Sequence, residues 1–266
     1  MTLFVISILI GCLSVMNVQG RRGKWPPGMP VTRPRLVAVG GTFEGSRGRP
    51  SDAYVIQERL VAAADGGTGA EAGHVAAALA LAAVIAGRPQ HGGTREQDLD
   101  DYVQAAHRAV RDAAPRNPGM TEPSSTLDLI VLDGGESPRL RFAHVGNGAI
   151  WHCPRGGTPA PLTTPHSFDD GPPLRALGRP AEIDTATNAE INTAVNAEVG
   201  AVAVRPGDRV VMMSDGVVQA LGVKRVTELL TGSASPVACL DRLYDELAAV
   251  EPKEDATVVI ADFVTV

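Results

Sequence analysis

The hydrophobic pattern from residue 36 onward alternates short apolar runs, bounded by turn residues, with longer segments of helical period. Apolar runs of about four to eight residues between Gly, Pro, Asn and Asp are typical of strands. The predicted strands are Leu36–Gly40, Tyr54–Ile56, Leu60–Ala64, Thr126–Leu132, Arg139–Val145, Ala149–His152, the run from Arg209 to Asp215, and Thr257–Phe263. Strands interspersed with helices in this way indicate one α/β or α+β body.

The helical segments differ in their polarity. Ala70–Ala86 is apolar nearly all round, which predicts a buried helix. Glu96–Ala114 has helical period, with acidic residues in its first turn and basic residues near its end, as the helix dipole favours. Further helices are predicted at about Lys224–Thr231 and Pro236–Val250.

Two connecting regions bear on the fold. Gly146-Asn147-Gly148 has the composition of a tight β-hairpin turn. The segment from Pro154 to about Gly200 is rich in Pro, Gly and Thr, which predicts an irregular surface flap. Within it, two eight-residue units that begin at Thr185 and Thr193 repeat each other, too few for a solenoid.

Residues 3–18 form an apolar run that is followed by a basic cluster ending at Lys24. A bilayer span needs about 20 residues, and a secretory signal carries basic residues before its apolar run, which this chain lacks. Three interpretations stay open. They are a lipobox at Leu9-Ile-Gly-Cys12, a signal anchor that keeps the rest of the chain in the cytoplasm, and a true start at Met16 or Met29.

At 266 residues and 44% hydrophobic content, the chain can bury a core of its own. We expect residues 1–34 to form a leader and Pro-rich linker, and residues 35–266 to form the functional domain. The net charge of −6, with no Lys/Arg cluster after residue 24, argues against nucleic acid as a partner. Cys12, Cys153 and Cys239 are far apart and odd in number, so they support neither a CxxC metal knuckle nor a disulfide framework.

Acidic residues recur at the ends of predicted strands. Asp65 and Asp215 each end a strand and precede a Gly, while Asp52 and Glu254-Asp255 lie just before two other strands. A single Asp in such a place is usually a turn former. Several together, without a matching His/Cys set, favour a hard cation such as Mg²⁺ or Mn²⁺ over zinc.

Short motifs follow one another in a recognisable order. They are Arg47-Gly-Arg-Pro-Ser-Asp52, Ala64-Asp65-Gly66, Ser124-Ser-Thr-Leu127, Ala143-His-Val-Gly-Asn147, Leu162-Thr-Thr-Pro-His-Ser167, Ala176-Leu-Gly178, Pro206-Gly-Asp208 with Ser214-Asp215-Gly216, and Glu254-Asp-Ala-Thr-Val-Val259. The series resembles that of the metal-dependent protein phosphatases of the 2C type and spans about residues 35–264. The resemblance implies an α+β fold, a four-layer α-β-β-α sandwich of two antiparallel sheets flanked by helices.

By that resemblance, Asp65 bridges two metal ions and the backbone carbonyl of Gly66 ligates one of them. The further metal positions that it implies are Asp52, Asp215 and Glu254. Two Mg²⁺ or Mn²⁺ ions about 3.5–4 Å apart acidify a shared water for in-line attack on a phosphoryl group. The implied activity is hydrolysis of phosphoserine or phosphothreonine in proteins.

The resemblance also implies that Arg47 binds the substrate phosphate, for which a guanidinium supplies a planar bidentate fork. His74, His144 and His166 are available as proton donors, although we expect each to be structural. His144 lies on a predicted core strand, and His74 replaces the Glu usual at that helix position.

Four positions depart from the family pattern. Asn147 replaces an Asp that serves an accessory third metal in bacterial members, so we expect that third site to be weak or absent. Ser51 replaces the acidic neighbour of Asp52. Glu254 is one methylene longer than the usual Asp, and Asp255 stands where the family has Asn. We expect a two-metal core with lowered or altered activity.

The alternative is a degenerate phosphatase fold that serves as a binding or regulatory module, and a third option is a phosphatase of small molecules. The expected partner is a phosphoprotein substrate of a Ser/Thr kinase. The expected location is the cytoplasm, with membrane contact only if residues 3–18 act as an anchor.

Overall fold

The computed structural model describes residues 33–46, 50–67, 73–87, 96–114, 122–133, 137–168, 171–179, 182–184, 189–192, 194–232 and 234–266. By their contacts, residues Pro34–Thr265 form one compact unit. The apolar run at residues 3–18, and the interpretations that depend on it, lie outside the described residues. The helices and strands described all belong to Pro34–Thr265.

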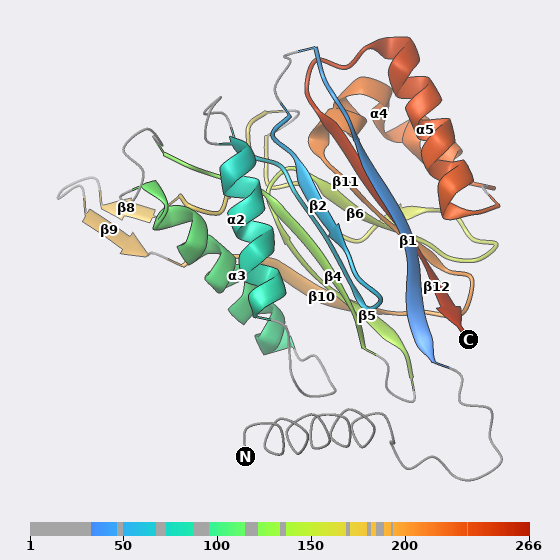
Figure 1. The fold of residues 1–266 in the computed structure, drawn as a ribbon, viewed down its shortest axis with the longest axis horizontal. Helices are drawn as coiled ribbons and strands as arrows, with labels where there is room; N and C mark the ends of the chain where they lie inside the picture. The colour runs from blue at the N-terminus through green and yellow to red at the C-terminus, as the bar shows by residue number, and fades with distance from the viewer. Residues whose placement is uncertain are drawn as a thin grey trace, which may run out of the picture. The chain divides into compact units, whose positions relative to one another are not determined.

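Two antiparallel sheets of five strands each form the centre of this unit (Figure 1). The first has the order β1 (Pro34–Phe43), β12 (Ala256–Thr265), β11 (Arg209–Met213), β6 (Ala149–Cys153), β7 (Ala160–Pro161). The second has the order β10 (Glu198–Ala203), β5 (Arg139–Val145), β4 (Leu127–Asp133), β3 (Leu60–Ala64), β2 (Ala53–Ile56). Strands β8 (Glu182–Asp184) and β9 (Ala189–Asn192) pair with each other apart from these sheets.

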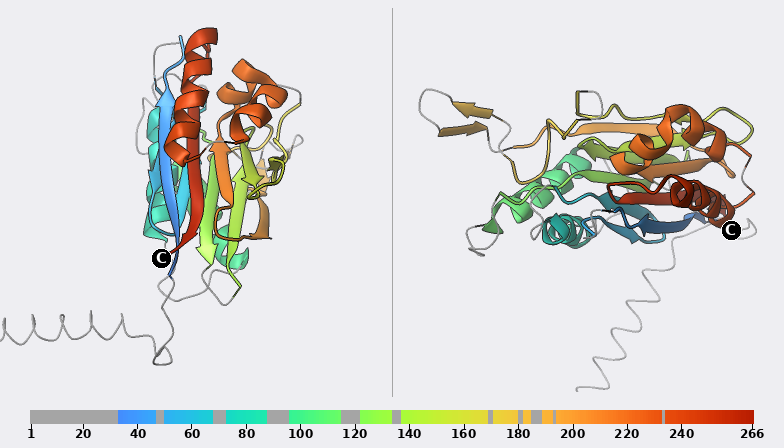
Figure 2. Two further views of the ribbon diagram at one scale, coloured as in Figure 1. Left: turned by 90° about the vertical axis from the view of Figure 1, so that its right-hand side faces the viewer. Right: turned by 90° about the horizontal axis from the view of Figure 1, so that it is seen from above.

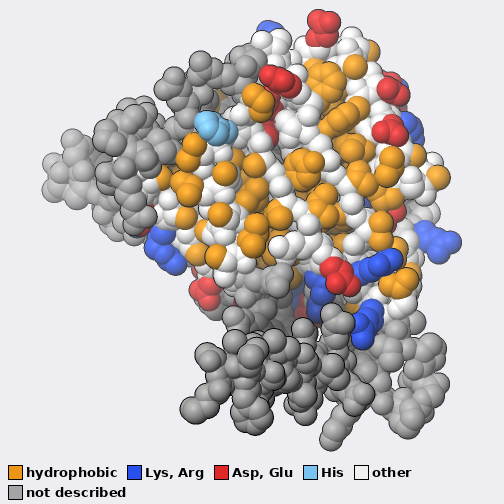
Figure 3. Space-filling model, in the orientation of Figure 1, with side chains coloured by type: hydrophobic (Ala, Val, Ile, Leu, Met, Phe, Trp, Pro, Cys, Tyr) orange, Lys and Arg blue, Asp and Glu red, His pale blue; other side chains and the backbone are white. Residues whose placement is uncertain are grey.

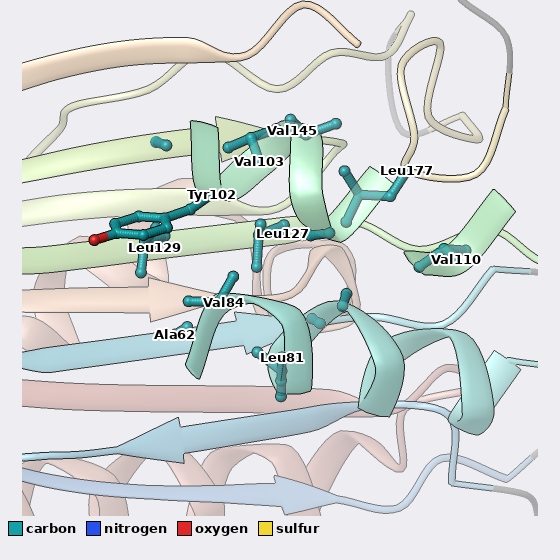
Figure 4. Close-up of a cluster of buried hydrophobic side chains, with 14 of the residues drawn as sticks. Ala62, Leu81, Val84, Tyr102, Val103, Val110, Leu127, Leu129, Val145 and Leu177 are labelled. Atoms are coloured by element: carbon teal, nitrogen blue, oxygen red, sulfur yellow. The ribbon is translucent and has the colours of Figure 1, made fainter. Parts of the chain in front are cut away.

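In the part of the chain that the structure describes, four helices flank the sheets: α2 (Gly73–Ala86), α3 (Glu96–Arg111), α4 (Asp215–Leu230) and α5 (Pro236–Val250). One hydrophobic core lies between the sheets, a second packs α2 and α3 on the second sheet, and a third packs α4 and α5 on the first. Figure 4 shows the second core, and Figure 2 shows the layers from two further sides. The order helix, sheet, sheet, helix confirms the predicted α-β-β-α sandwich.

Strand β4 illustrates how the sequence builds these layers. Side chains alternate between the two faces of a strand. Leu127 and Leu129 therefore face the helices α2 and α3, while Ile130 and Leu132 face the other sheet. Because both faces are covered, β4 is apolar at five of its seven positions, on both faces, instead of alternating strictly with polar residues.

The predicted hairpin at Gly146-Asn147-Gly148 is wrong. Strand β5 pairs with β4 and β10, whereas β6 pairs with β11 and β7 in the other sheet. The Gly-Asn-Gly segment is therefore a loop that crosses between sheets. Strand β6 is apolar on both faces, and its place in the first sheet puts Ile150 between the sheets and Trp151 under the helices. Tertiary burial overrides the local turn signal.

The prediction that the apolar Ala70–Ala86 helix is buried is only half right. Its described part, α2, buries one face through residues such as Ala80 and Val84, but Ala78 and Ala82 on the opposite face are exposed. Ile85, near its end, is 39% exposed. Hydrophobic side chains gather over the face formed by β1, β2 and α2, with charged groups around its edges (Figure 3). A flanking helix packs on a sheet with one face only. The apolar residues on the opposite face of α2 therefore stay exposed, which the sequence of the helix does not reveal.

Two further boundaries differ from the prediction. The segment expected to be an irregular flap up to Gly200 ends in β10, which pairs with β5, and Val195 before it is only 4% exposed. The helix expected from Lys224 begins at Asp215 directly after β11 and bends at Gly222, where φ is 74°. The flap is therefore shorter, and Asp215 belongs to a helix N-terminus. Among the described residues, no helix is both long and apolar enough to cross a membrane.

Candidate metal centre

A pocket of about 570 Å³ lies where strand ends of both sheets meet. Asp52 precedes β2 and Asp65 follows β3, and the pairing of Ala53 with Ala64 sets these two residues opposite each other. Asp215 follows β11, and Glu254 precedes β12, which is the neighbour of β11. Each sheet thus contributes two adjacent strand ends. The predicted metal positions Asp52, Asp65, Gly66, Asp215 and Glu254 all line this one pocket.

The backbone N–H and carbonyl groups of Asp65 are both held by residues that directly precede β4. Its N–H donates to Thr126 Oγ1 at 2.9 Å, and its carbonyl accepts from Thr126 N at 2.8 Å and from Ser125 Oγ at 3.0 Å. At the next residue, a Cβ on Gly66 would lie 2.1 Å from the carbonyl oxygen of Gly73. Only glycine fits between Asp65 and the start of α2, which explains the Asp-Gly pair.

Three partly buried aspartates, Asp52, Asp65 and Asp215, repel one another. Burial, together with the charges of Asp52 and Asp215, raises the pKa of Asp65 well above its ordinary value. Burial raises the pKa of Asp52 to about 6, with a further contribution from the charge of Asp255. Burial and the charge of Glu254 raise the pKa of Asp215. Such a cluster needs positive charge nearby to stay ionised at neutral pH.

Asp52 gives the clearest sign of a missing positive partner. Both of its carboxylate oxygens are buried and lack a hydrogen bond of acceptable geometry from the described residues, although the hydroxyls of Thr257 and Ser214 lie near enough to lower its pKa somewhat. Five carboxylates line the pocket, and none of its described lining residues is Lys or Arg. Since buried charges are normally paired or coordinate metals, this donor set fits hard divalent cations.

The carboxylates line the same pocket, but their side chains are not close enough together to form a complete set of metal ligands. Within the described ranges, no three Asp, Glu, His or Cys side chains converge closely enough to count as a ready ligand set. Glu254 lines the pocket and its charge acts on Asp215, so the extra methylene does not take it away from the site. Carbonyl groups, such as that of Gly66, complete oxygen sites of this class.

Asn147 lies between Asp215 and the flap. Its Nδ2 donates to Asp215 Oδ2 at 2.6 Å and to the carbonyl of Gly171 at 3.4 Å. The neutral amide thus donates hydrogen bonds to two oxygens. It occupies the position at which the family resemblance implied an accessory metal ligand. Gln219, one helical turn after Asp215 on α4, also donates to Asp215 Oδ2, at 2.8 Å.

Histidines surround the pocket unevenly. His144 is fully buried on β5, and its Nδ1 lies 2.6 Å from Asp128 Oδ1, so it is structural as expected. His166 packs against it with ring centres 4.7 Å apart and accepts a hydrogen bond from Gly146 N–H through Nδ1. Burial, with the neighbouring His144 and Arg175, lowers the pKa of His166 to about 4. Of the three predicted proton donors, only the exposed His74 lines the pocket.

Sequence reasoning missed some residues that shape this site. Ser125, Thr126 and Gln219 were quoted without a role or not at all, yet they hold Asp65 and Asp215. The spacing of four residues between Asp215 and Gln219 on a helix was the available signal. Arg47, predicted to bind the phosphate, lies outside the described residues.

A four-layer sandwich with an acidic pocket at its strand ends defines a class of metal-dependent phosphatases, and comparison with known families agrees. The chain belongs to the protein phosphatase 2C family, whose model matches residues 51–254. This match confirms the resemblance stated from the motifs.

Individual relatives are more distant. The chain is 26% identical over 226 residues to the serine/threonine protein phosphatase PstP of Mycobacterium tuberculosis, covering 82% of this chain and 43% of the relative. The chain thus spans less than half the length of that relative. The crystal structure of the Mycobacterium tuberculosis phosphatase PstP/Ppp superposes with a TM-score of 0.72 at 24% identity, covering 86% of this chain and 98% of the other.

Two other solved structures share the fold. The catalytic domain of PstP in complex with two manganese ions has a TM-score of 0.71 at 24% identity, over 87% of this chain and 99% of the other. PppA, a regulatory component of type VI secretion in Pseudomonas aeruginosa, has a TM-score of 0.70 at 19% identity, over 87% and 99%. At these identities the likeness concerns the fold.

Proposed function

We propose that this chain is a Mg²⁺- or Mn²⁺-dependent phosphatase that hydrolyses phosphoserine or phosphothreonine in proteins. The observation that carries the proposal is a group of carboxylates in a pocket whose described lining holds no Lys or Arg, where both oxygens of Asp52 are buried and lack a hydrogen bond of acceptable geometry from the described residues. Membership of the protein phosphatase 2C family supports the same activity.

The residues that would hold two cations are Asp52, Asp65, the carbonyl of Gly66, Asp215 and Glu254. When bound, the cations supply an acidified water and neutralise the phosphoryl oxygens. Asp65, between Asp52 and Asp215, is the residue best placed to act on both. The strand ends hold the carboxylates in a partly buried position, which strengthens their electrostatic interactions.

Substrate binding is assigned to Arg47 by the family resemblance, because its guanidinium can donate two parallel hydrogen bonds to a phosphate. The substrate would be the target of a separate Ser/Thr kinase. Ser124, Ser125 and Thr126 line the pocket and carry hydroxyl groups, which suits a polar phosphoester.

The test is hydrolysis of p-nitrophenyl phosphate and of a phosphothreonine peptide by the purified full chain with and without Mn²⁺. We expect Mn²⁺-dependent turnover that Asp65→Asn reduces by at least about a hundredfold, since it removes the charge shared between the cations. Asp241→Asn, an exposed position on α5, is the matched control and should keep wild-type activity. Absence of Mn²⁺-dependent turnover in the wild-type chain contradicts the proposal.

The second candidate, a binding module without turnover, rests on the amide of Asn147 and the lengthened Glu254. Calorimetric titration separates the two functions. Two Mn²⁺ ions bound with no hydrolysis of either substrate supports the module, whereas binding with hydrolysis supports the enzyme.

We further propose that residues 35–266 form the phosphatase domain, that it works in the cytoplasm, and that residues 3–18 decide whether it contacts the membrane. Cell fractionation of the full chain beside a chain that starts at Met29 tests this. Membrane recovery of the full chain alone supports an anchor, and identical recovery in the supernatant contradicts one.

A further inference from the structure

Asp255, at the position of the family's Asn, lines the pocket and accepts hydrogen bonds from backbone groups. Its Oδ1 accepts a hydrogen bond from Gly45 N–H at 3.0 Å. Its Oδ2 accepts from Ser51 N–H at 2.7 Å and from Ser51 Oγ at 3.3 Å. Both carboxylate oxygens are thereby used on the two chain segments that bracket residues 46–50.

Ser51 links Asp255 to two of the proposed metal positions, Asp52 and Gly66. It directly precedes Asp52, and its carbonyl accepts a hydrogen bond from Gly66 N–H at 3.2 Å. Asp255, Ser51 and Gly66 therefore form a continuous chain of hydrogen bonds. These hydrogen bonds fix the position of Asp52 relative to the turn that carries Asp65.

The backbone of Asp255 also contacts the segment that carries Asp215, another of the proposed metal positions. Ser214 Oγ donates to the Asp255 carbonyl at 3.3 Å. A Cβ on Gly216 would lie 2.1 Å from that carbonyl, so the start of α4 packs directly against it. On the other side, a Cβ on Gly45 would lie 2.4 Å from the backbone of Glu254. The segment is enclosed between two glycines that allow close backbone approach.

The chemistry of these contacts requires a carboxylate. All three groups that face the side chain of Asp255 are donors, and an ionised carboxylate is the side chain that only accepts. An Asn at this position would present its NH₂ to one of the two N–H groups, so one donor would be left unpaired. This explains why the residue departs from the family's amide.

We propose that Asp255 is a positioning residue that holds the Asp52, Gly66 and Asp215 segments in register for cation binding, and is not itself a metal ligand. The inference rests on the proposed function. Partners that orient metal ligands in this way typically contribute about 10- to 100-fold to metal affinity.

The experiment is calorimetric titration of the metal-free full chain with MnCl₂, together with thermal melting and the kcat and KM for p-nitrophenyl phosphate. For Asp255→Asn we expect Mn²⁺ affinity about 10-fold weaker or more, with the same number of ions bound. We expect turnover to recover at high Mn²⁺, because the ligands themselves remain. Glu254→Gln, in contrast, should reduce the number of ions or abolish saturation.

Asp208→Asn is the matched control. Asp208 also accepts two backbone N–H groups, from Arg155 at 2.9 Å and from Arg205 at 3.0 Å, but it precedes β11 whereas Asp215 follows that strand. We expect Asp208→Asn to lower the melting temperature and leave the Mn²⁺ affinity unchanged. If Asp255→Asn does not fold, Asp255→Glu, which keeps both acceptor oxygens but displaces them, should show a smaller loss of affinity.

Three results are distinguishable from the expected one. A lower melting temperature with unchanged Mn²⁺ affinity, as in the Asp208→Asn control, overturns the positioning role. Loss of one bound ion in Asp255→Asn makes Asp255 a ligand and overturns the inference as well. No Mn²⁺ binding by the wild-type chain overturns the proposed function itself, and the inference with it.

Discussion

At the scale of single residues, the site is defined by which acidic groups lack a partner and which have one. Both carboxylate oxygens of Asp52 are buried and lack a hydrogen bond of acceptable geometry from the described residues, whereas those of Asp255, which lines the same pocket, accept hydrogen bonds from Gly45 and Ser51. Carboxylates of equal charge therefore differ in role. The first is suited to bind a cation, and the second to hold the chain that carries it.

Asn147 offers a prediction at this scale. Asn147→Asp would put carboxylate oxygens against Asp215 Oδ2 and the Gly171 carbonyl, in place of the amide that now donates to both. We expect the metal-free variant to melt at a lower temperature because of the added repulsion. In the presence of Mn²⁺, the variant should bind one more ion than wild type, because the new carboxylate, Asp215 Oδ2 and the Gly171 carbonyl would together offer oxygen ligands for a cation.

Titration calorimetry counts the ions, and Asn147→Ala is the control that removes the donor without adding charge. The control should bind no additional ion. An unchanged ion count in Asn147→Asp would show that the amide does not occupy a latent cation position.

At the scale of elements, β4 and β5 are joined by a buried ion pair as well as by their ladder. Asp128 lies opposite His144 in the register, and both side chains are buried. Burial alone lowers the pKa of His144, but the charge and hydrogen bond of Asp128, with a contribution from Glu198, raise it above its ordinary value. The pair thus stabilises the second sheet most when the imidazole is protonated.

This gives a prediction for pH. A His whose pKa is raised on folding contributes stability that is complete below its unfolded pKa of about 6.5 and is lost as pH rises through the folded value. We expect the metal-free chain to lose unfolding free energy from this pair as the pH rises from 6 to 9. Urea unfolding at both pH values measures it.

Asp128→Asn is the comparison for that measurement, because it removes the charge that raises the His144 pKa. His166, whose ring packs on His144, and Glu198 face the same imidazole and stay unchanged in the variant. If wild type and variant lose equal stability with rising pH, the pair is not responsible.

At the scale of the whole molecule, the site joins the two sheets. Asp52 and Asp65 come from the ends of β2 and β3, and Asp215 and Glu254 come from the ends of β11 and β12 in the other sheet. A cation held by both pairs would link the layers, which otherwise meet through the hydrophobic core between them.

We therefore expect Mn²⁺ to raise the melting temperature of the full chain in a concentration-dependent way. Binding to the folded state alone stabilises by about 2.7 kcal/mol at a free concentration of 100 Kd. Both Asp65→Asn and Asp215→Asn should abolish the shift, although the two residues lie on different sheets. Scanning calorimetry with MnCl₂, and with CaCl₂ as a second cation, checks this, and a shift that survives either variant argues against a shared site.

Much of the fold was readable from the sequence because strands covered on both faces leave a strong local mark. Leu60–Ala64 and Arg139–Val145 have the predicted bounds, and the order of motifs indicated the sandwich. The acidic strand ends, including Asp65 and Asp215, were also evident, since residue type and a following Gly are properties of the chain itself.

The tertiary structure alone decided which segments meet. Gly146-Asn147-Gly148 had the composition of a hairpin turn, yet β5 pairs with β4 in the second sheet and β6 pairs with β11 in the first. The pattern of α2 did not show that one of its apolar faces stays exposed. Likewise, Asp52 and Asp255 differ only in the donors that distant segments bring to them. Composition and period fix what each element can bury, whereas contacts between distant segments depend on how the layers pack.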